Sequence, residues 1–273
     1  MKNVFSVVLL IVPIIIFCQK KWDLKFYNEV IGREYAIYAD NNEAMPMSAK
    51  FNFKMTNLKS TLANDEIIVV PPKSKRYLVA KITPIKANVG NQFSYTNTFN
   101  FGNAAQEKFD DDYIYSLPFS KGKTHLIYQG YNGKFSHQKD AALDFDTQSG
   151  DSVFAAREGT VVLTEDSHNQ GCPTVSCAKF NNKILIMHSD GTFADYAHLN
   201  YKGIAVKKGD FIEKGQLIGY SGNTGFSSGP HLHFAVFINR IDGSRTFIKT
   251  KFKTSQSEAT FLEEGKSYSK NYQ

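Results

Sequence analysis

The amino-acid sequence predicts a mostly β protein with two domains: a small, sandwich-like N-terminal β domain, then a larger domain built on an antiparallel β-sheet. Tyr and Phe dominate an aromatic content of 14%, and these residues favour strands over helices. Short segments with period-two alternation recur between Asn, Asp, Gly and Pro, whereas long helical runs of Ala, Leu and Glu are missing. The 273 residues are enough for one large or two modest domains, each with a core of its own.

Residues 1–19 have the features of a signal peptide. Lys2 precedes an apolar stretch, Val4 to Phe17, that is too short for a comfortable membrane span. Cys18 has the position of a lipidated cysteine, but the bulky Phe17 stands where lipoprotein signals have a small residue. We therefore expect cleavage near Cys18, a secreted or periplasmic mature protein, and attachment to a membrane only if Cys18 is lipidated.

Residues 20–110 are predicted to form an accessory β domain that positions or gates the next one. Phe51, Phe53 and Met55 illustrate its period-two alternation, and no cluster of His, Cys or acidic residues able to do chemistry lies there. Residues 103–112 are polar and acidic, as in a linker, which places the boundary near residue 110. The expected strands are Glu34–Asp40, Ala49–Leu58, Glu66–Val70, Lys75–Ile82 and Gln92–Phe101.

Residues 111–245 are predicted to form the second domain, and residues 246–273 a C-terminal strand and tail. Glycine-bearing turns such as Gly209-Asp210 link the strands. The strands expected are Thr124–Tyr128, Ala141–Asp146, Ser152–Thr164, Lys183–His188, Thr192–His198, Gln216–Ser221, His231–Ile238 and, in the tail, Thr246–Phe252.

Charge and cysteine usage narrow the class of partner. The net charge of +6 suits an anionic polymer, but Lys and Arg form no run typical of nucleic-acid binding, so nucleic acid is not expected as a partner. In an oxidising compartment Cys172 and Cys177 can form a short-loop disulfide, with a pair of free thiols as the alternative. Zinc binding by this pair is disfavoured because no further cysteines complete a thiolate site.

The triplet His231-Leu232-His233 lies in a strand-like run. Residues two apart on a strand point to one face, so both imidazoles can converge on one site, although two histidines on the wet face of a sheet fit the same pattern. With His137 and Asp144 upstream, one histidine of the pair completes a three-ligand zinc site that keeps a fourth position open for water. A remaining histidine of the pair, or His198, is then a candidate general base and acid.

Four ordered sequence blocks resemble the LytM/lysostaphin-type M23 peptidases over about Gly130 to Ile238. The blocks are Ser136-His137 with Leu143-Asp144-Phe145, then Val153 to Gly159, then Tyr196-Ala197-His198-Leu199, and finally Gly222 to Gly225 running into Gly229-Pro230-His231-Leu232-His233-Phe234. Together they are far more specific than any one of them.

The resemblance implies an antiparallel β-sheet peptidase domain that acts as a zinc-dependent metalloendopeptidase on peptide crosslinks of bacterial peptidoglycan. By the same resemblance the zinc ligands are His137, Asp144 and His233. His198 and His231 flank the metal-bound water and carry protons. Tyr131 is expected to hydrogen-bond the developing oxyanion.

The spacing of the first two ligands departs from the short family members. Asp144 lies seven residues after His137 instead of four, which leaves Asp140 and Asp146 as rival ligands. Asp144 is favoured because the Asp-Phe pair directly precedes the Gly150 turn and the next strand, as in the family.

The other histidines, His188, His125 and His168, are interpreted as strand or loop histidines with local hydrogen bonds. Residues 172–177 and 223–228 are expected either to border the substrate groove or to be plain surface turns.

Three alternative functions remain. Val206 to Gly219 resembles the hairpins of lipoyl- or biotin-carrier modules but has no lysine-bearing tip motif. A catalytically inactive wall-binding protein could activate another hydrolase, although every expected ligand is present. A secreted metallopeptidase acting on proteins would use the same zinc chemistry.

Overall fold

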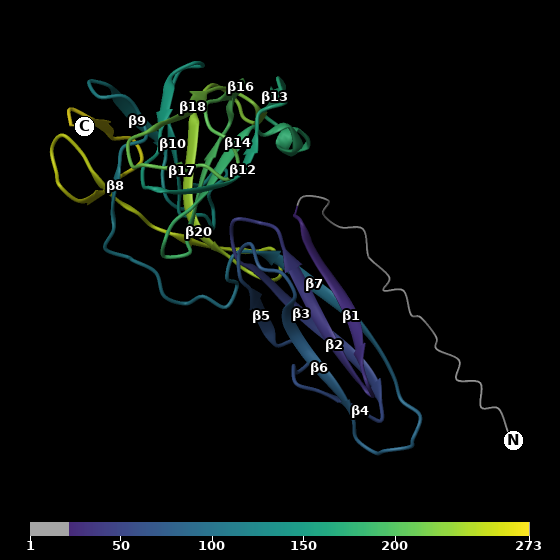
Figure 1. Cartoon of the computed structure of the whole chain (residues 1–273). Coiled ribbons are helices and arrows are strands. Elements are labelled where there is room, and N and C mark those ends of the chain that lie inside the picture. The colour runs from purple at the N-terminus through teal and green to yellow at the C-terminus, as the bar shows by residue number, and fades with distance from the viewer. Residues whose placement is uncertain (1–21, 273) are drawn as a thin grey trace, which may run out of the picture. The chain divides into compact units, whose positions relative to one another are not determined.

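The computed structural model describes residues 22–272, which divide between Ala104 and Ala105 into two compact units (Figure 1). The expected signal segment and Cys18 lie outside the described residues. The mostly β fold is confirmed, because residues 22–272 contain 24 strands and one short 3-10 helix. None of the helices in this part of the chain is long and apolar enough to cross a membrane. The boundary predicted near residue 110 falls a few residues after the observed division.

The first unit contains two antiparallel sheets. The four-stranded sheet has the order β1 (Leu24–Ile31), β2 (Glu34–Asn41), β6 (Tyr77–Pro84) and β4 (Leu58–Ser60). The three-stranded sheet has the order β5 (Ile67–Val70), β3 (Met47–Thr56) and β7 (Gln92–Phe101).

Aromatic side chains join these two sheets. Phe51 and Phe53 are buried at alternate positions of β3, so one face of that strand is apolar. The ring of Phe26 on β1 lies 5.1 Å from that of Phe51, edge to face. The alternation noted in the sequence therefore builds the core of a small two-sheet unit.

The second unit is organised around a nine-stranded sheet. Its order is β17 (Phe211–Ile212), β12 (Gly159–Glu165), β14 (Lys183–Met187), β15 (Phe193–Ala197), β20 (Leu232–Asn239), β10 (Ala142–Phe145), β9 (Thr124–Gln129) and β24 (Ser267–Ser269), with β21 (Arg245–Ile248) also paired to β20. All of these pairings are antiparallel.

Three smaller sheets complete the second unit. They are β11 (Ser152–Phe154) with β18 (Leu217–Ser221) and β16 (Leu199–Ile204); β13 (Gly171–Cys172) with β19 (Gly225–Phe226); and β23 (Thr260–Phe261) with β22 (Lys251–Lys253) and β8 (Ile114–Ser116). The 3-10 helix η1 covers Val175–Phe180. The core is rich in aromatic residues, and the rings of Tyr196 and Phe234 lie 5.1 Å apart within it.

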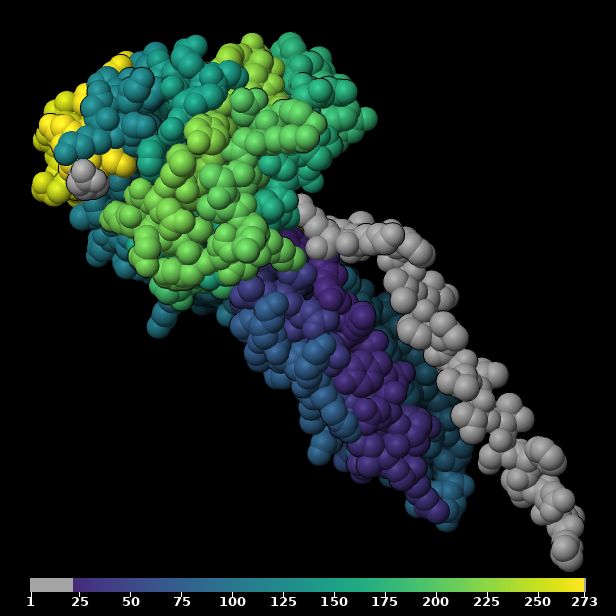
Figure 2. All heavy atoms as spheres, turned by 45° about the horizontal axis from the view of Figure 1, so that its top comes forward, coloured from purple at the N-terminus to yellow at the C-terminus, as the bar shows by residue number. Residues whose placement is uncertain are grey.

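The structure corrects several predicted strands. The run expected over Ser152–Thr164 is two strands, because β11 pairs with β18 while β12 pairs with β14 and β17. The strand expected over Thr246–Phe252 likewise splits into β21 and β22. The tail was expected to be polar sequence after residue 252, yet it adds β23 and β24. β24 pairs with β9, and Figure 2 shows the yellow C-terminal residues beside teal ones.

Candidate metal centre

Strands β10 and β20 bring a carboxylate and an imidazole face to face. They are antiparallel neighbours, and their register places Asp144 directly opposite His233. Side chains opposite each other in such a pair start only about 4.5–5.5 Å apart at Cβ. The Nδ1 atom of His233 consequently lies 3.0 Å from Oδ1 of Asp144.

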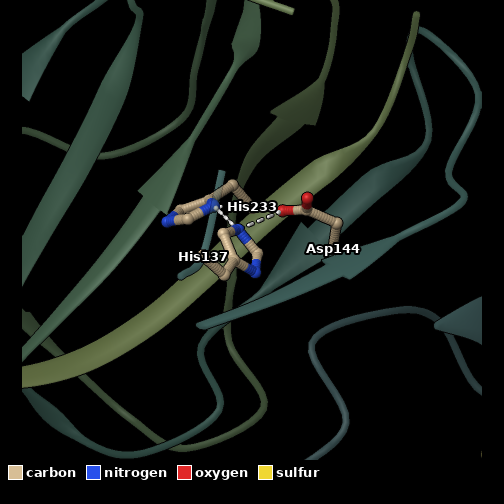
Figure 3. Close-up of side chains that lie close together, drawn as sticks. All are labelled: His137, Asp144 and His233. Carbon is tan, nitrogen blue, oxygen red and sulfur yellow. Dashed lines mark hydrogen bonds and ion pairs between the residues drawn. The ribbon is translucent and has the colours of Figure 1, made fainter. Parts of the chain in front are cut away.

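The third member of the cluster comes from the loop between β9 and β10. The Nε2 atom of His137 lies 3.2 Å from Nδ1 of His233 and 3.4 Å from Oδ1 of Asp144 (Figure 3). On the other side of the ring, Nδ1 of His137 lies 3.2 Å from the carbonyl oxygen of Gly130. A proton on Nδ1 satisfies that carbonyl and leaves the Nε2 lone pair directed at the other two side chains.

The geometry of these three side chains fits a metal ion. One ligand atom from each lies within 4.8 Å of the other two. In a tetrahedral site with bonds of about 2.0–2.1 Å, neighbouring ligand atoms are roughly 3.3 Å apart, close to the separations of His137, Asp144 and His233. The Nε2 atom of Gln129 donates to Oδ2 of Asp144 at 2.8 Å and so orients the carboxylate from behind.

The negative charge of Asp144 also favours the binding of a cation. Its side chain is only 4% exposed, and within residues 22–272 it forms no ion pair with Lys or Arg. Burial alone would raise the pKa of Asp144, but hydrogen bonds and charge from His137 and His233 hold it well below its usual range. For His137, burial acts to lower the pKa, but the nearby Asp144 outweighs burial, so the pKa of His137 is raised. A divalent ion among these groups would neutralise the carboxylate directly.

Two further histidines lie beside the cluster. The rings of His198 and His231 are 4.4 Å apart, and Nε2 of His231 lies 3.9 Å from Oδ1 of Asp144. Nδ1 of His198 lies 2.7 Å from the carbonyl oxygen of Thr224, and Nδ1 of His231 lies 2.8 Å from that of Gly229. Each carbonyl therefore selects the tautomer that carries its proton on Nδ1, which leaves Nε2 able to accept one.

Burial keeps both of these imidazoles neutral at pH 7. Burial, together with the neighbouring His231 and His233, lowers the pKa of His198 to about 3. Burial also lowers the pKa of His231. Two neutral ring nitrogens beside a metal-type ligand set are suited to general base catalysis.

The rival aspartates lie outside the cluster. The Asp146 carboxylate accepts the backbone N–H of Leu126 at 2.6 Å and lies 3.3 Å from Nδ1 of His125. Asp140 is not among the residues whose ligand atoms converge. Of the three candidates, the structure brings only Asp144 together with His137 and His233.

Tyr131, expected from the sequence to hydrogen-bond the oxyanion, has a different hydrogen-bond partner in the structure. Its hydroxyl donates to the carbonyl oxygen of Thr250 at 2.7 Å. The tyrosine at the site is Tyr128 on β9, whose ring lies 5.5 Å from that of His231 and is 41% exposed. Burial and the negative charge of Asp144 raise its pKa, so the hydroxyl stays protonated and can donate. Its place at the end of a predicted strand beside Gln129 was the available signal.

The remaining histidines are elsewhere in the second unit. His188 is buried, with Nδ1 2.8 Å from the carbonyl oxygen of Glu158. His125 packs on Phe119 at 4.6 Å between ring centroids. His168 packs on Phe180 at 5.6 Å. None of the three contributes to the cluster.

A β fold that directs two imidazoles and a carboxylate at one point, beside two neutral imidazoles, defines a site of the metallopeptidase class. Residues 138–244, which lie in the second unit, match Peptidase family M23. The matched range includes Asp144, His198, His231 and His233, and His137 precedes it by one residue. A match to this peptidase family, together with the convergence of His137, Asp144 and His233, is consistent with a metal cofactor at this site.

Known relatives are similar to part of the chain. Over 95 residues the chain is 36% identical to the peptidoglycan DD-endopeptidase ShyA of Vibrio cholerae, covering 35% of this chain and 19% of that protein. Over 116 residues it is 34% identical to lysostaphin of Staphylococcus staphylolyticus, covering 42% of this chain and 21% of the relative. The chain thus spans about a fifth of the length of these relatives.

Solved structures are also similar to part of the chain. One is the catalytic domain of the antimicrobial peptidase lysostaphin from Staphylococcus simulans. The two share 29% sequence identity, over 51% of this chain and 87% of that one, with a TM-score of 0.33.

Proposed function

We propose that this chain is a zinc-dependent metalloendopeptidase that hydrolyses peptide crosslinks of bacterial peptidoglycan. The observation that carries the proposal is the convergence of His137, Asp144 and His233 beside the neutral His198 and His231. Relatives named as peptidoglycan DD-endopeptidases support the choice of substrate.

The donor set favours zinc over other ions. Two imidazole nitrogens and one carboxylate oxygen are ligands that zinc accepts in a four-coordinate site, and three protein ligands leave one position for water or substrate. Calcium and magnesium prefer six or more oxygen donors, which His137 and His233 do not supply. When bound, zinc would act here as a Lewis acid towards a peptide carbonyl.

The side chains of this protein then divide the remaining work. Nε2 of His231 or His198 takes a proton from the attacking water and delivers it to the departing amine. The Tyr128 hydroxyl donates a hydrogen bond to the carbonyl oxygen as negative charge develops on it. Gln129 and the Gly130 carbonyl hold Asp144 and His137 in orientation.

Action in the cell envelope and an accessory role for the first unit belong to the same proposal. A signal-like segment at residues 1–19 supports export. The first unit is a separate β unit in which we identify no catalytic cluster among the described residues. An inactive wall-binding activator is the second candidate, but the complete ligand set and the two neutral histidines argue against it.

The test combines zinc analysis with digestion of purified peptidoglycan. Wild type should contain about one zinc ion per chain and release crosslink-cleavage products. His233→Ala should lose both zinc and products, whereas His231→Ala, which keeps all three proposed ligands, should retain zinc and lose products. Zinc without cleavage in wild type would contradict the peptidoglycan substrate, and a wild type without zinc would contradict the metal assignment.

A further inference from the structure

The imidazoles of the two histidines outside the proposed ligand set are hydrogen-bonded to backbone carbonyls of one segment of the chain. His198 and His231 bond through Nδ1 to the carbonyls of Thr224 and Gly229. Both carbonyls belong to residues 222–231, called here the anchor segment. The position of each imidazole therefore depends on what holds the anchor segment in place.

The anchor segment pairs with residues 170–182, called here the disulfide loop. β13 runs parallel to β19. The N–H of Gly225 donates to the carbonyl of Gln170 at 2.9 Å, and the N–H of Ser227 donates to that of Cys172 at 3.1 Å. The buried hydroxyl of Ser227 lies 3.1 Å from Nδ1 of His231. A single residue thus separates the backbone of Cys172 from the His231 imidazole.

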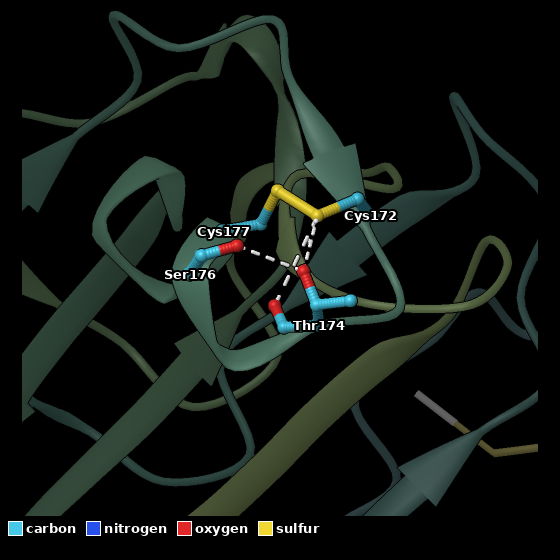
Figure 4. Close-up of a disulfide and its surroundings, with 4 residues drawn as sticks. All are labelled: Cys172, Thr174, Ser176 and Cys177. Atoms are coloured by element: carbon cyan, nitrogen blue, oxygen red, sulfur yellow. Dashed lines mark hydrogen bonds between the residues drawn. A yellow bond between two sulfur atoms is a disulfide. The ribbon is translucent and has the colours of Figure 1, made fainter.

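A disulfide closes the loop on itself. Cys172 and Cys177 form a disulfide. The Thr174 hydroxyl lies 3.1 Å from the sulfur of Cys172 and 2.8 Å from the hydroxyl of Ser176 (Figure 4). The bond fixes the end of β13 against η1. Such a crosslink limits the conformations open to a short exposed loop.

The far end of the disulfide loop reaches His198. Helix η1 ends at Phe180 and is followed by two asparagines. Oδ1 of Asn181 accepts the backbone N–H of His198 at 2.9 Å, and the N–H of Asn182 donates to the Thr224 hydroxyl at 3.2 Å. His198 also has a φ of +62°, which is unfavourable for a residue with a side chain and needs such partners to persist.

The backbones of the disulfide loop and the anchor segment are in such close contact that two glycines have no space for a side chain. A Cβ on Gly171 would meet the Asn223 carbonyl oxygen at 1.9 Å. A Cβ on Gly225, whose φ is +82°, would meet Asn181 at 2.8 Å. These glycines allow the two backbones to touch, so a change in one segment is transmitted to the other.

The proposed metal ligands have different supports. Asp144 and His233 lie on β10 and β20, and their partners are each other, His137 and Gln129. His137 is anchored on Gly130. None of these hydrogen bonds involves the disulfide loop.

We propose that the Cys172–Cys177 disulfide is a positioning element for His198 and His231, so that its redox state controls turnover without controlling metal content. The inference rests on the proposed peptidase function. Opening the bond takes two electrons and two protons. A water-soluble phosphine supplies the electrons as it becomes the phosphine oxide, taking its oxygen from water, and two thiols result. The cysteines are not catalytic residues in this scheme, because they touch no reacting atom.

The test compares the oxidised full chain, the same chain after phosphine treatment, and the Cys172→Ser/Cys177→Ser variant. Reduction and substitution should each lower kcat at least about tenfold, with KM within about twofold and zinc content unchanged. The double variant is its own control, since phosphine should have no further effect on it. If it fails to fold, reduction of the native protein supplies the same comparison.

Imidazole ¹⁵N chemical shifts of the zinc-loaded chain provide a second measurement that does not need activity. Reduction should shift the signals of His198 and His231 and leave His137 in place. An unchanged kcat with both thiols titrated would overturn the proposal, as would zinc loss in parallel with activity. If the oxidised wild type cuts no peptidoglycan, the proposed function fails and the ¹⁵N shifts alone decide the positioning role.

Discussion

A buried group of polar side chains lies near each end of strand β14, and each group contains one aspartate. The two aspartates differ in the side chains that compensate their negative charge. Beyond its C-terminal end, Asp190 accepts a hydrogen bond from Arg157 at 2.8 Å, and the guanidinium lies 4.0 Å over the Tyr113 ring. At the other end, beside His198 and His233, the polar partners of Asp144 among the described residues are imidazoles and an amide. A buried carboxylate paired with a guanidinium is costly to unpair, whereas one surrounded by imidazoles and an amide is suited to bind a cation.

Replacing each of these aspartates by the matching amide should separate the two roles most sharply. Asp144→Asn is expected to lower zinc affinity by more than about 100-fold, because it removes the proposed anionic ligand. Asp190→Asn should leave zinc affinity unchanged and destabilise the fold by about 2 kcal/mol, because Arg157 loses its counter-charge. Competition with a zinc chelator and calorimetric unfolding would measure the two effects. Equal zinc affinity in both variants would remove Asp144 from the ligand set.

Tyr128 and Tyr131 can be compared in the same way, because among the described residues one hydroxyl has a hydrogen-bond partner and the other does not. Within residues 22–272 the Tyr128 hydroxyl donates to no other side chain or backbone group, whereas Tyr131 donates to Thr250. Tyr128→Phe is expected to lower kcat about 10- to 100-fold through loss of a donor to the developing oxyanion. Tyr131→Phe should preserve kcat and cost about 1 kcal/mol of stability. Steady-state kinetics on a soluble crosslinked peptide would measure kcat for both variants. A larger loss of kcat in Tyr131→Phe than in Tyr128→Phe would contradict the prediction.

Local pattern was enough to predict much of the site. Period-two spacing predicted that His231 and His233 share a strand face, and the sequence blocks predicted that His137, Asp144 and His233 come together, as they do in the structure. Pattern could not show that Tyr128 on β9 lies beside His231, because that contact joins residues far apart in the sequence. The direct pairing of Asp144 with His233 likewise depends on strand register, a long-range property.

The strands that sequence analysis missed share a physical cause. β1 is an edge strand of its sheet and most of its side chains are exposed or half-buried, so its apolar alternation is weak. β24 has no buried side chain and pairs with β9, far away in the sequence. Conversely, Ser152–Thr164 looked like one strand because Ala155 and Ala156 are buried between its two halves. Hydrophobic pattern reports burial more directly than it reports which strand pairs with which.

A pH-dependent effect is expected at His188, which lies with Arg157 and Asp190. Burial lowers the pKa of His188 to about 4, while an unfolded histidine titrates near about 6.5. Between these values the unfolded chain binds the extra proton, so stability falls as pH falls from about 6.5 towards 4. At pH 4.5 this contribution amounts to about 2–3 kcal/mol. His188→Asn can still donate to the Glu158 carbonyl but does not titrate, so it should lose less stability than wild type between pH 7 and 4.5. Calorimetric unfolding of both full-length proteins at the two pH values would measure this difference, and equal losses would mean that His188 titrates normally in the folded state.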